Sequence, residues 1–359
     1  MMLMKFFNKL FVVGLLLTIS LGAEAQDIHF SQFYMSPLNL NPAMTGVMNC
    51  KSRFVANYRN QWASVLRSNA YNTYSASYDQ RVPIGRYDYM GFGGTLWGDK
   101  AGQVSFSTLQ ARLSGSYSKQ MGGDRNSGHF LVAGAEVGVS QRSIDFFKAQ
   151  WGEQNDKGTF NGNLPSNEQF LNRDNFLFAD VSAGLLWFSV FDEYNNFYVG
   201  GAYSHLNRAN QSFDKNKFHP LWSKFTLHAG GEFQLSDRFS LVPGLVTFIQ
   251  GPSLEVNAGT SFKFQLTNPN GWDNQSFQIG TFLRLANRYK ATDGSGGGIL
   301  ADAFILSTRF DYNDFAVGFS YDLNVSSLKT ASQYNGGFEF ALIYKMCGPE
   351  SRNVYCPNF

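Results

Sequence analysis

Two adjoining stretches near the C-terminus, Asp314–Leu323 and Tyr334–Met346, alternate apolar and polar or small residues. In the first, Phe315, Val317 and Phe319 lie on one parity. A period of two is typical of β-strands, because successive side chains point to opposite faces of a sheet. Each stretch is about ten residues long, which is the length that a tilted strand needs to cross the hydrocarbon of a bilayer. The pattern predicts a hairpin with one apolar face.

The same alternation recurs along most of the chain. It predicts about fourteen strands, near 53–60, 71–80, 88–98, 103–118, 128–140, 176–190, 197–205, 223–235, 238–249, 254–266, 275–288, 299–311, 314–323 and 334–346. Single-chain bacterial barrels have an even number of strands.

Composition narrows the class of protein. The chain has 35 Phe, 17 Tyr and 36 Gly, and only 16% of its residues are charged, whereas charged residues usually approach a quarter of a soluble domain. Past the first 25 residues, no stretch is apolar for long enough to form a spanning helix. These features predict an all-β fold, namely a transmembrane outer-membrane barrel of antiparallel strands with an irregular N-terminal segment.

The first 25 residues have the pattern of a secretory signal peptide. Lys5 and Lys9 precede the apolar run Leu10–Leu21, and Ala23-Glu24-Ala25 offers a cleavage site; the alternative is an uncleaved anchor. Cleavage would leave 27 basic and 26 acidic residues, a balance that gives no support for a nucleic-acid partner.

The expected divisions of the chain are 1–25 signal peptide, 26–50 irregular periplasmic segment or plug, 51–346 barrel and 347–359 periplasmic tail.

Two places interrupt the alternation. Around Thr108–Ala111 the apolar parity switches, which predicts a bulge or two shorter elements. Pro243 falls within a predicted strand, where its missing N–H removes a ladder hydrogen bond, so we expect a bulge or a kinked end there. If residue 26 starts in the periplasm, the longest connections, including 155–175 and 292–298, lie outside the cell, and 267–274 lies inside.

The segment 26–50 has neither the helical nor the strand period, and its aromatic side chains need a surface to pack against. We expect it either to contact a partner protein or to plug the barrel, and we leave both open. The residues concerned are Phe30, Phe33, Tyr34, Pro37, Asn41 and Pro42.

The order of several short stretches resembles that of a known family. QDIHFSQFYMSPLNLNPAMTG, NYRNQWASV and TYSASYDQ open the mature chain, and SQRSIDF, DVSAGLLW, YVGGAYSHLN, FTLHAGGEF, VGFSYDLNVSSL and the final CPNF follow. Together they resemble the PorP/SprF family of Bacteroidetes outer-membrane proteins, over essentially the whole mature chain. The resemblance implies association with type IX secretion, either as part of the machinery or in export and surface attachment of a large gliding-motility adhesin.

The polar parity of the strands carries charges of both signs. One interpretation is a water-filled pore or a surface that grips an exported segment; the other, which we favour, is a closed lumen filled by ion pairs and hydrogen bonds. The residues expected to face the lumen are Lys224, His228, Glu232, Glu255, Lys263, Arg284, Arg309, Asp311, Glu339 and Lys345.

Three cysteines lie near the ends of the barrel. Cys347 and Cys356 are close in sequence after the last strand, and an oxidising envelope permits a bridge between them. Cys50 is a rival partner, because barrel closure brings the first and last strands together. We expect the pair Cys347–Cys356 first, with a bridge from Cys50 as the alternative.

No sequence motif for catalysis is present. There is no H-E-x-x-H or G-x-S-x-G, and the five histidines lack metal-ligand spacing. A barrel phospholipase would need a Ser–His pair at the lipid face, whereas His228 is on the polar parity. We therefore expect no enzyme activity, no metal and no cofactor.

Three functions are compatible with these observations. The first is a non-enzymatic outer-membrane partner of type IX secretion that exports or anchors a large surface adhesin, in contact with periplasmic or lipoprotein subunits. The second is a core secretion component bridging to periplasmic ring subunits. The third is a diffusion channel for small solutes, since about fourteen strands suffice for either an open or a filled lumen.

Overall fold

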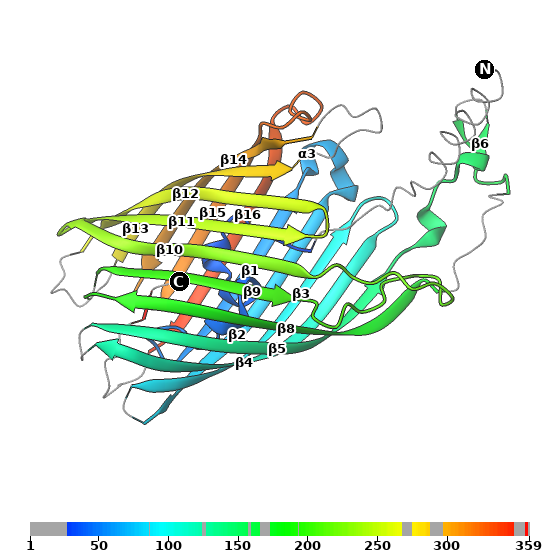
Figure 1. Ribbon diagram of the computed structural model, residues 1–359. Helices are drawn as coiled ribbons and strands as arrows, with labels where there is room; N and C mark the ends of the chain where they lie inside the picture. The colour runs from blue at the N-terminus through cyan, green and yellow to red at the C-terminus, as the bar shows by residue number, and fades with distance from the viewer. Residues whose placement is uncertain are drawn as a thin grey trace, which may run out of the picture.

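Fourteen antiparallel strands form a closed barrel (Figure 1). The computed structural model describes residues 27–85, 87–123, 127–156, 159–165, 173–192, 194–267, 275–287, 297–347 and 356–357. Each barrel strand pairs with the strands before and after it in the sequence, and the first pairs with the last. The predicted signal peptide, 1–25, lies outside the described residues, as do most of 267–274 and 292–298.

The strands lie close to the predicted ranges. They are β1 (Ser52–Gln61), β2 (Tyr71–Ile84), β3 (Asp88–Ala101), β4 (Phe106–Gly123), β5 (Gly128–Ser143), β8 (Asn175–Val190), β9 (Asn196–Ser204), β10 (Lys224–Ser236), β11 (Phe239–Gln250), β12 (Ser253–Gln265), β13 (Gln275–Asn287), β14 (Ile299–Tyr312), β15 (Phe315–Asn324) and β16 (Asn335–Met346). A separate two-stranded hairpin, β6 (Asn155–Asp156) and β7 (Thr159–Phe160), lies in the long connection between β5 and β8.

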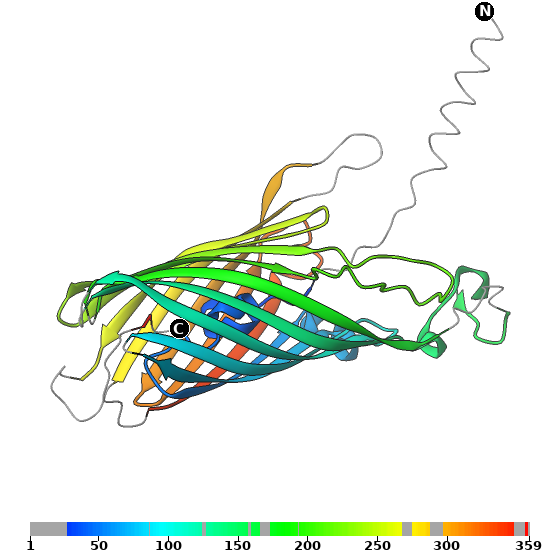
Figure 2. The ribbon, with the colours of Figure 1, turned by 60° about the horizontal axis from the view of Figure 1, so that its bottom comes forward.

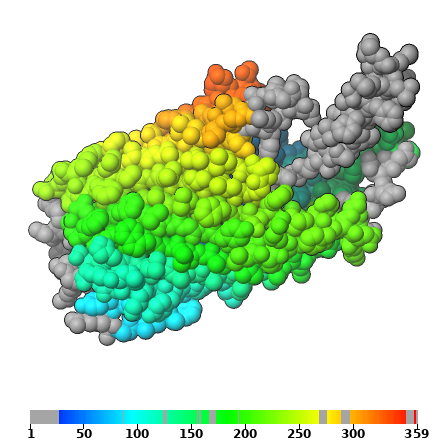
Figure 3. Space-filling view, viewed as in Figure 1, coloured from blue at the N-terminus to red at the C-terminus, as the bar shows by residue number. Residues whose placement is uncertain are grey.

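The alternation of side chains accounts for the barrel. Large apolar side chains on one parity are exposed on the outer wall, as for Phe319 (39%) and Phe340 (49%), while the other parity points inward and is mostly polar or small. Aromatic pairs across neighbouring strands add contacts on the outer face: the ring centroids of Phe319 and Phe340 are 5.1 Å apart. Figure 3 shows that the side chains of the strands on the side in view form a continuous wall.

The predicted bulge at Thr108–Ala111 is wrong. β4 pairs continuously with β3 and β5 through these residues, and its register shift lies between Gln120 and Gly122. The apparent change of parity arises because Phe106 points inward, where its ring lies 5.5 Å from the Arg142 guanidinium.

Pro243 lies within β11 and faces Thr260 of β12. On its other side the β10–β11 register runs from Gly230↔Gly244 to Phe233↔Leu241 with no paired residues between. The missing N–H of the proline therefore falls in a gap of the ladder, where no hydrogen bond is lost.

The two ends of the barrel differ in the length of their connections. At one end, which we call the loop end, lie the connections 62–70, 102–105, 144–174, 205–223, 251–252, 288–298 and 325–334. At the other, the turn end, lie 85–87, 124–127, 191–195, 237–238, 266–274 and 313–314. Figure 2 shows the longer connections projecting at the loop end. Short helical turns at that end are α3 (Ala63–Leu66), η3 (Arg67–Asn69), η4 (Phe146–Lys148) and η5 (Gly152–Gln154).

No helix among the described residues is both long and apolar enough to span a membrane. The remaining helical turns, η1 (Phe33–Met35), α2 (Pro37–Leu40) and η2 (Pro42–Met44), belong to residues 27–50, which lie inside the barrel (Figure 2). We call residues 27–50 the N-terminal segment.

Candidate functional site

The lumen of the barrel and the N-terminal segment within it form the candidate site. The segment folds into three short turns, and prolines and an asparagine fix the starts of the second and third. Pro37 and Pro42 occupy the first helical positions of α2 and η2, where the missing N–H costs nothing. The Asn41 side chain accepts from the backbone N–H of Ala43 at 2.8 Å and so caps η2.

One side of the segment packs against an apolar part of the inner wall. The ring of Phe33 meets Phe282 edge-on at 5.9 Å, and that of Tyr34 stacks on Phe282 at 5.6 Å. The apolar cluster combines segment residues with inward side chains of the strands: Phe33, Leu40, Ala43, Met44 and Val47 with Tyr89, Phe130, Val132, Leu186, Phe188, Val190, Tyr198, Val246, Phe282 and Ile305.

The other side of the segment meets buried charges of the wall. Glu339 of β16 accepts from the backbone N–H groups of Ser31 at 2.7 Å and Gln32 at 2.9 Å. Asp322 of β15 accepts from the Ser31 hydroxyl at 2.9 Å. The hydrogen bonds from Ser31 and Gln32 to Glu339 satisfy buried backbone donors, and such charge-assisted bonds are stronger than neutral ones.

Two arginines neutralise these carboxylates. Arg59 Nη1 lies 3.2 Å from Glu339 Oε1, and Arg284 Nη2 lies 2.7 Å from Asp322 Oδ2. Arg59 also donates to the carbonyl of His29 at 2.9 Å. The charges of the wall are thus compensated within the lumen, because a lone buried charge would be costly.

At the loop end the first two described residues, Asp27 and Ile28, are held by the ends of β10 and β11 and by the connection after β9. The Asp27 N–H donates to Gln250 at 2.9 Å, and Lys224 Nζ donates to the Ile28 carbonyl at 3.2 Å. His205, directly after β9, lies between two carboxylates: Nε2 is 2.5 Å from Asp27 and Nδ1 is 2.9 Å from Asp180. Burial alone would lower the pKa of His205, but the two carboxylates raise it to about 10, so its imidazolium donates to both.

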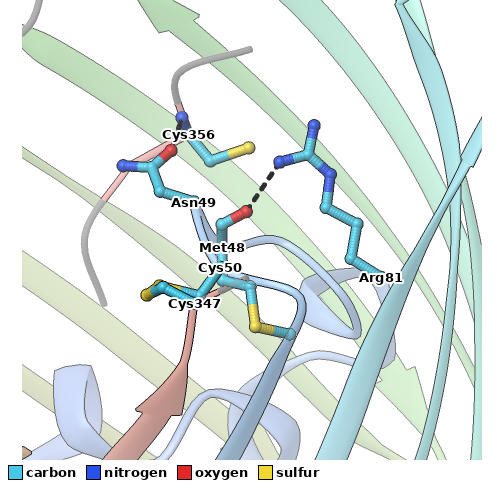
Figure 4. The surroundings of a disulfide bond; sticks show 6 residues. All are labelled: Met48, Asn49, Cys50, Arg81, Cys347 and Cys356. Atoms are coloured by element: carbon cyan, nitrogen blue, oxygen red, sulfur yellow. Dashed lines mark hydrogen bonds between the residues drawn. A yellow bond between two sulfur atoms is a disulfide. The ribbon is translucent and has the colours of Figure 1, made fainter. Parts of the chain in front are cut away.

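At the turn end the segment is tied to β1 and β2. Arg53 donates to Asp79 at 2.8 Å, and the same carboxylate accepts from the Gly46 N–H at 2.8 Å. Arg81 donates to the Met48 carbonyl at 2.9 Å (Figure 4). Both ion-paired side chains, Arg53 and Asp79, are fully buried.

The disulfide joins Cys50 to Cys347 (Figure 4), so the pairing expected first, Cys347–Cys356, is not the one in the structure. The physical reason is barrel closure: β1 and β16 pair with Ser52 opposite Met346, and this register brings the Cα atoms of the two cysteines to 4.3 Å. Cys356 is buried outside the disulfide, with its Sγ 3.8 Å from the Tyr89 hydroxyl.

The structure brings five of the ten expected lumen residues into contact with the segment. Lys224 and Glu339 bind its backbone, and Glu255 lies 3.5 Å from His29. His228 Nε2 is 3.0 Å from Asn41 Nδ2, and Arg284 donates to the Ser31 hydroxyl. The others pair along the wall: Lys263 with Glu232 at 2.8 Å and Arg309 with Asp311 at 2.8 Å. Lys345 lies opposite Arg53 in the β1–β16 register.

The six aromatic, proline and asparagine residues singled out in the segment are not displayed on a surface. Phe30 is 3% exposed, Phe33 2% and Asn41 0%, and Pro37 and Pro42 are also buried, while Tyr34 is half-buried. Phe33 and Tyr34 contact the barrel wall at Phe282, and Asn41 contacts it at His228.

Several residues of the site escaped the sequence analysis. Arg53, Arg59, Asp79 and Asp322 lie on the polar parity of strands, and only strict parity counting would have found them. A second signal is glycine at inward-facing positions of the strands, where the N-terminal segment approaches the wall closely. A Cβ at Gly91, Gly134, Gly184 or Gly318 would collide with Thr45, Ala43, Asn41 or Met35 of the segment, respectively.

Within the described part of the chain, no group of three or more His, Cys, Asp or Glu side chains could hold a metal ion. The polar side chains of the lumen are instead engaged with one another and with the backbone of the segment. The arrangement can hold the N-terminal segment in place within the lumen.

The comparison with protein families gives a match over most of the chain. Residues 22–344 match the family model described as type IX secretion system membrane protein PorP/SprF. No curated protein matches the sequence.

Among solved structures, the chain is similar to CdiB from Escherichia coli, with 8% identity and a TM-score of 0.46 over 81% of this chain and 63% of that one. It is also similar to CdiB from Acinetobacter baumannii, with 9% identity and a TM-score of 0.42 over 82% and 60%. A bacterial polysaccharide outer membrane secretin gives 8% identity and a TM-score of 0.37 over 83% and 99%. The chain thus spans about three fifths of the first two proteins.

Proposed function

The chain belongs to the PorP/SprF family of type IX secretion system membrane proteins, and from this premise we propose that it is a non-enzymatic partner for export or surface attachment of one large secreted adhesin of the gliding-motility type. It is an outer-membrane β-barrel. Its partners would be that adhesin together with periplasmic or lipoprotein subunits of the secretion system, after removal of residues 1–25 as a signal peptide.

The observation that carries this proposal is the occupied lumen. Phe33 and Met44 of the N-terminal segment are 2% and 1% exposed inside the barrel, and Glu339 binds the segment's backbone. A barrel filled by its own chain is suited to work through the surfaces at its two ends. An exported protein would then be bound at the loop end, since long connections of such barrels face the exterior.

Two alternatives predict different behaviour. A diffusion channel would conduct in planar bilayers, which the hydrogen-bonded and apolar contacts of the segment oppose. A core secretion component that bridges to periplasmic ring subunits would bind its partners at the turn end. The end of the barrel at which the partner binds therefore distinguishes export or attachment of an adhesin from the bridging role.

Co-purification from native membranes tests the proposal. The protein would be isolated from native membranes with an affinity tag, and bound proteins would be identified by mass spectrometry. Phe147 and Phe218 are 102% and 69% exposed at the loop end, and Phe191 is 53% exposed at the turn end. The variant F147S/F218S should lose an adhesin-sized partner by at least tenfold, and F191S should retain it.

The opposite outcome would favour the bridging role: loss of periplasmic subunits in F191S with no change in F147S/F218S. Recovery of no secretion subunit or exported protein with the wild-type chain would contradict both. A steady conductance of the wild-type barrel in planar bilayers would favour the channel.

A further inference from the structure

The N-terminal segment follows β2 through the barrel in sequence order. Asn39 Nδ2 donates to Ser75 at 2.8 Å, the Gly46 N–H donates to Asp79 at 2.8 Å, and the Met48 carbonyl accepts from Arg81 at 2.9 Å. β2 begins at the loop end and finishes at the turn end. The segment therefore runs in the same direction, from the loop end towards the turn end.

The beginning of the segment lies at the loop end itself. Asp27 contacts Gln250, the last residue of β11, and Ile28 contacts Lys224, the first residue of β10. Both strand ends border loop-end connections. A small cavity here is lined by Asp27, His29, Lys224, Phe248 and Glu255, among others.

The end of the segment lies at the turn end. Cys50 is bonded to Cys347, which follows the last residue of β16. Between Asp27 and Cys50 the backbone is supplied with partners by the wall, including Asn57, which donates to the Met35 carbonyl at 3.1 Å. A non-helical stretch at membrane depth needs such partners, because the hydrocarbon offers none.

We propose that the N-terminal segment is an additional crossing of the outer membrane, made inside the barrel, which displays Asp27 at the cell surface while Cys50 remains on the periplasmic side. Long connections of outer-membrane barrels face the exterior, so the loop end is the outer end. This reverses the expectation that residue 26 starts in the periplasm. Both strand termini, Ser52 and Met346, still lie at the periplasmic end, as an even strand number requires.

The consequence is that Asp27, the first described residue of the segment, lies on the outer side of the membrane, while Lys224 and Glu255 of the wall beside it are buried. The disulfide at Cys50 holds the far end of the same segment to β16. The inference concerns topology alone and does not depend on which protein binds there.

An epitope inserted directly before Asp27 tests the topology. The same epitope between Asp237 and Arg238, in the turn joining β10 to β11, is the control from the other end. Antibody binding to intact cells is compared with binding after permeabilisation. We expect the first epitope to be bound equally in both conditions, and the control epitope to be bound only after permeabilisation. Binding of the first epitope only after permeabilisation, or of the control on intact cells, would overturn the proposal.

A single substitution provides a second test in case the inserted epitope disturbs folding. D27C is treated on intact cells with a membrane-impermeant maleimide, and the wild-type chain, with its remaining thiol Cys356 buried, is the control. Labelling of D27C at least tenfold above wild type supports the surface location. Labelling that appears only after permeabilisation, or only after the permeabilised protein is denatured, rejects it.

Discussion

The backbone N–H of Ser31 donates to the carboxylate of Glu339 at 2.7 Å across 308 positions of the sequence. The same carboxylate accepts from Gln32 and lies 3.2 Å from Arg59. One side chain of the last strand therefore binds both the N-terminal segment and a cation of the first strand. This contact links closure of the barrel to the position of the segment.

Substitution of Glu339 should loosen the segment. E339Q keeps the size of the side chain but removes the charge, so Arg59 loses a buried partner and two backbone donors lose a carboxylate. Breaking a buried pair costs about 3–5 kcal/mol. We expect intermittent conductance in planar bilayers and a lower melting temperature. The control is E232Q, which alters a wall pair with Lys263 away from the segment; equal behaviour of the two variants would contradict the role of Glu339.

The outward parity should tolerate charge poorly. Phe262 and Phe319 are each 39% exposed on the outer wall, so an arginine there would face lipid. F262R or F319R should each cost about 2–4 kcal/mol near the midplane of the bilayer, measured as the free energy of unfolding in lipid vesicles. F147R, in a connection outside the strands, is the control and should change stability little. Tolerance of both strand substitutions would argue against the assigned parity.

The disulfide should stabilise the closed barrel. C50S opens a covalent loop with a sequence separation of 297 residues, and loop entropy sets an upper limit of about 6 kcal/mol on the loss. C356S removes no bridge and is the matched control. Non-reducing peptide mapping should recover Cys50 linked to Cys347. A peptide linking Cys347 to Cys356 would show a different pairing in the cell.

The barrel could be predicted from the sequence because its signal is local. Alternation along a stretch such as Asp314–Leu323 needs no knowledge of the rest of the chain, since parity alone decides which side chains face lipid. The error at Thr108–Ala111 has the same origin. An inward aromatic such as Phe106 resembles a change of parity until its partner Arg142 is known.

The occupied lumen could not be predicted in the same way. Glu339 and Ser31 are distant in sequence, and nothing near either residue identifies the other. The disulfide was misassigned for the same reason: Cys347 and Cys356 are neighbours along the chain, but the β1–β16 register places Cys50 closer. The register between β1 and β16 is a property of the closed sheet, and it cannot be read from the sequence of either strand alone.

The contact of His205 with Asp27 and Asp180, which we call the His205 clamp, should weaken at high pH. The pKa of His205 is raised from about 6.5 in the unfolded chain to about 10 in the folded protein. A raised pKa contributes stability that is complete below about pH 6.5, declines as the pH rises and is lost above about pH 10. The free energy of unfolding should fall over this range by a few kcal/mol more in the wild type than in H205Q. Parallel pH profiles would contradict the clamp.

A methyl group on the inner wall should displace the segment. A Cβ at Gly134 of β5 would lie 2.5 Å from the backbone of Ala43, whereas at Gly115 of β4 its nearest neighbour would be 3.9 Å away. Backbone cannot yield as a flexible side chain can, so G134A must shift η2 or strain the strand. We expect G134A to fold less stably, by about 1–3 kcal/mol, and to conduct in planar bilayers. G115A should match the wild type in both measurements. A silent, fully stable G134A would mean that Ala43 does not pack against β5 in the membrane.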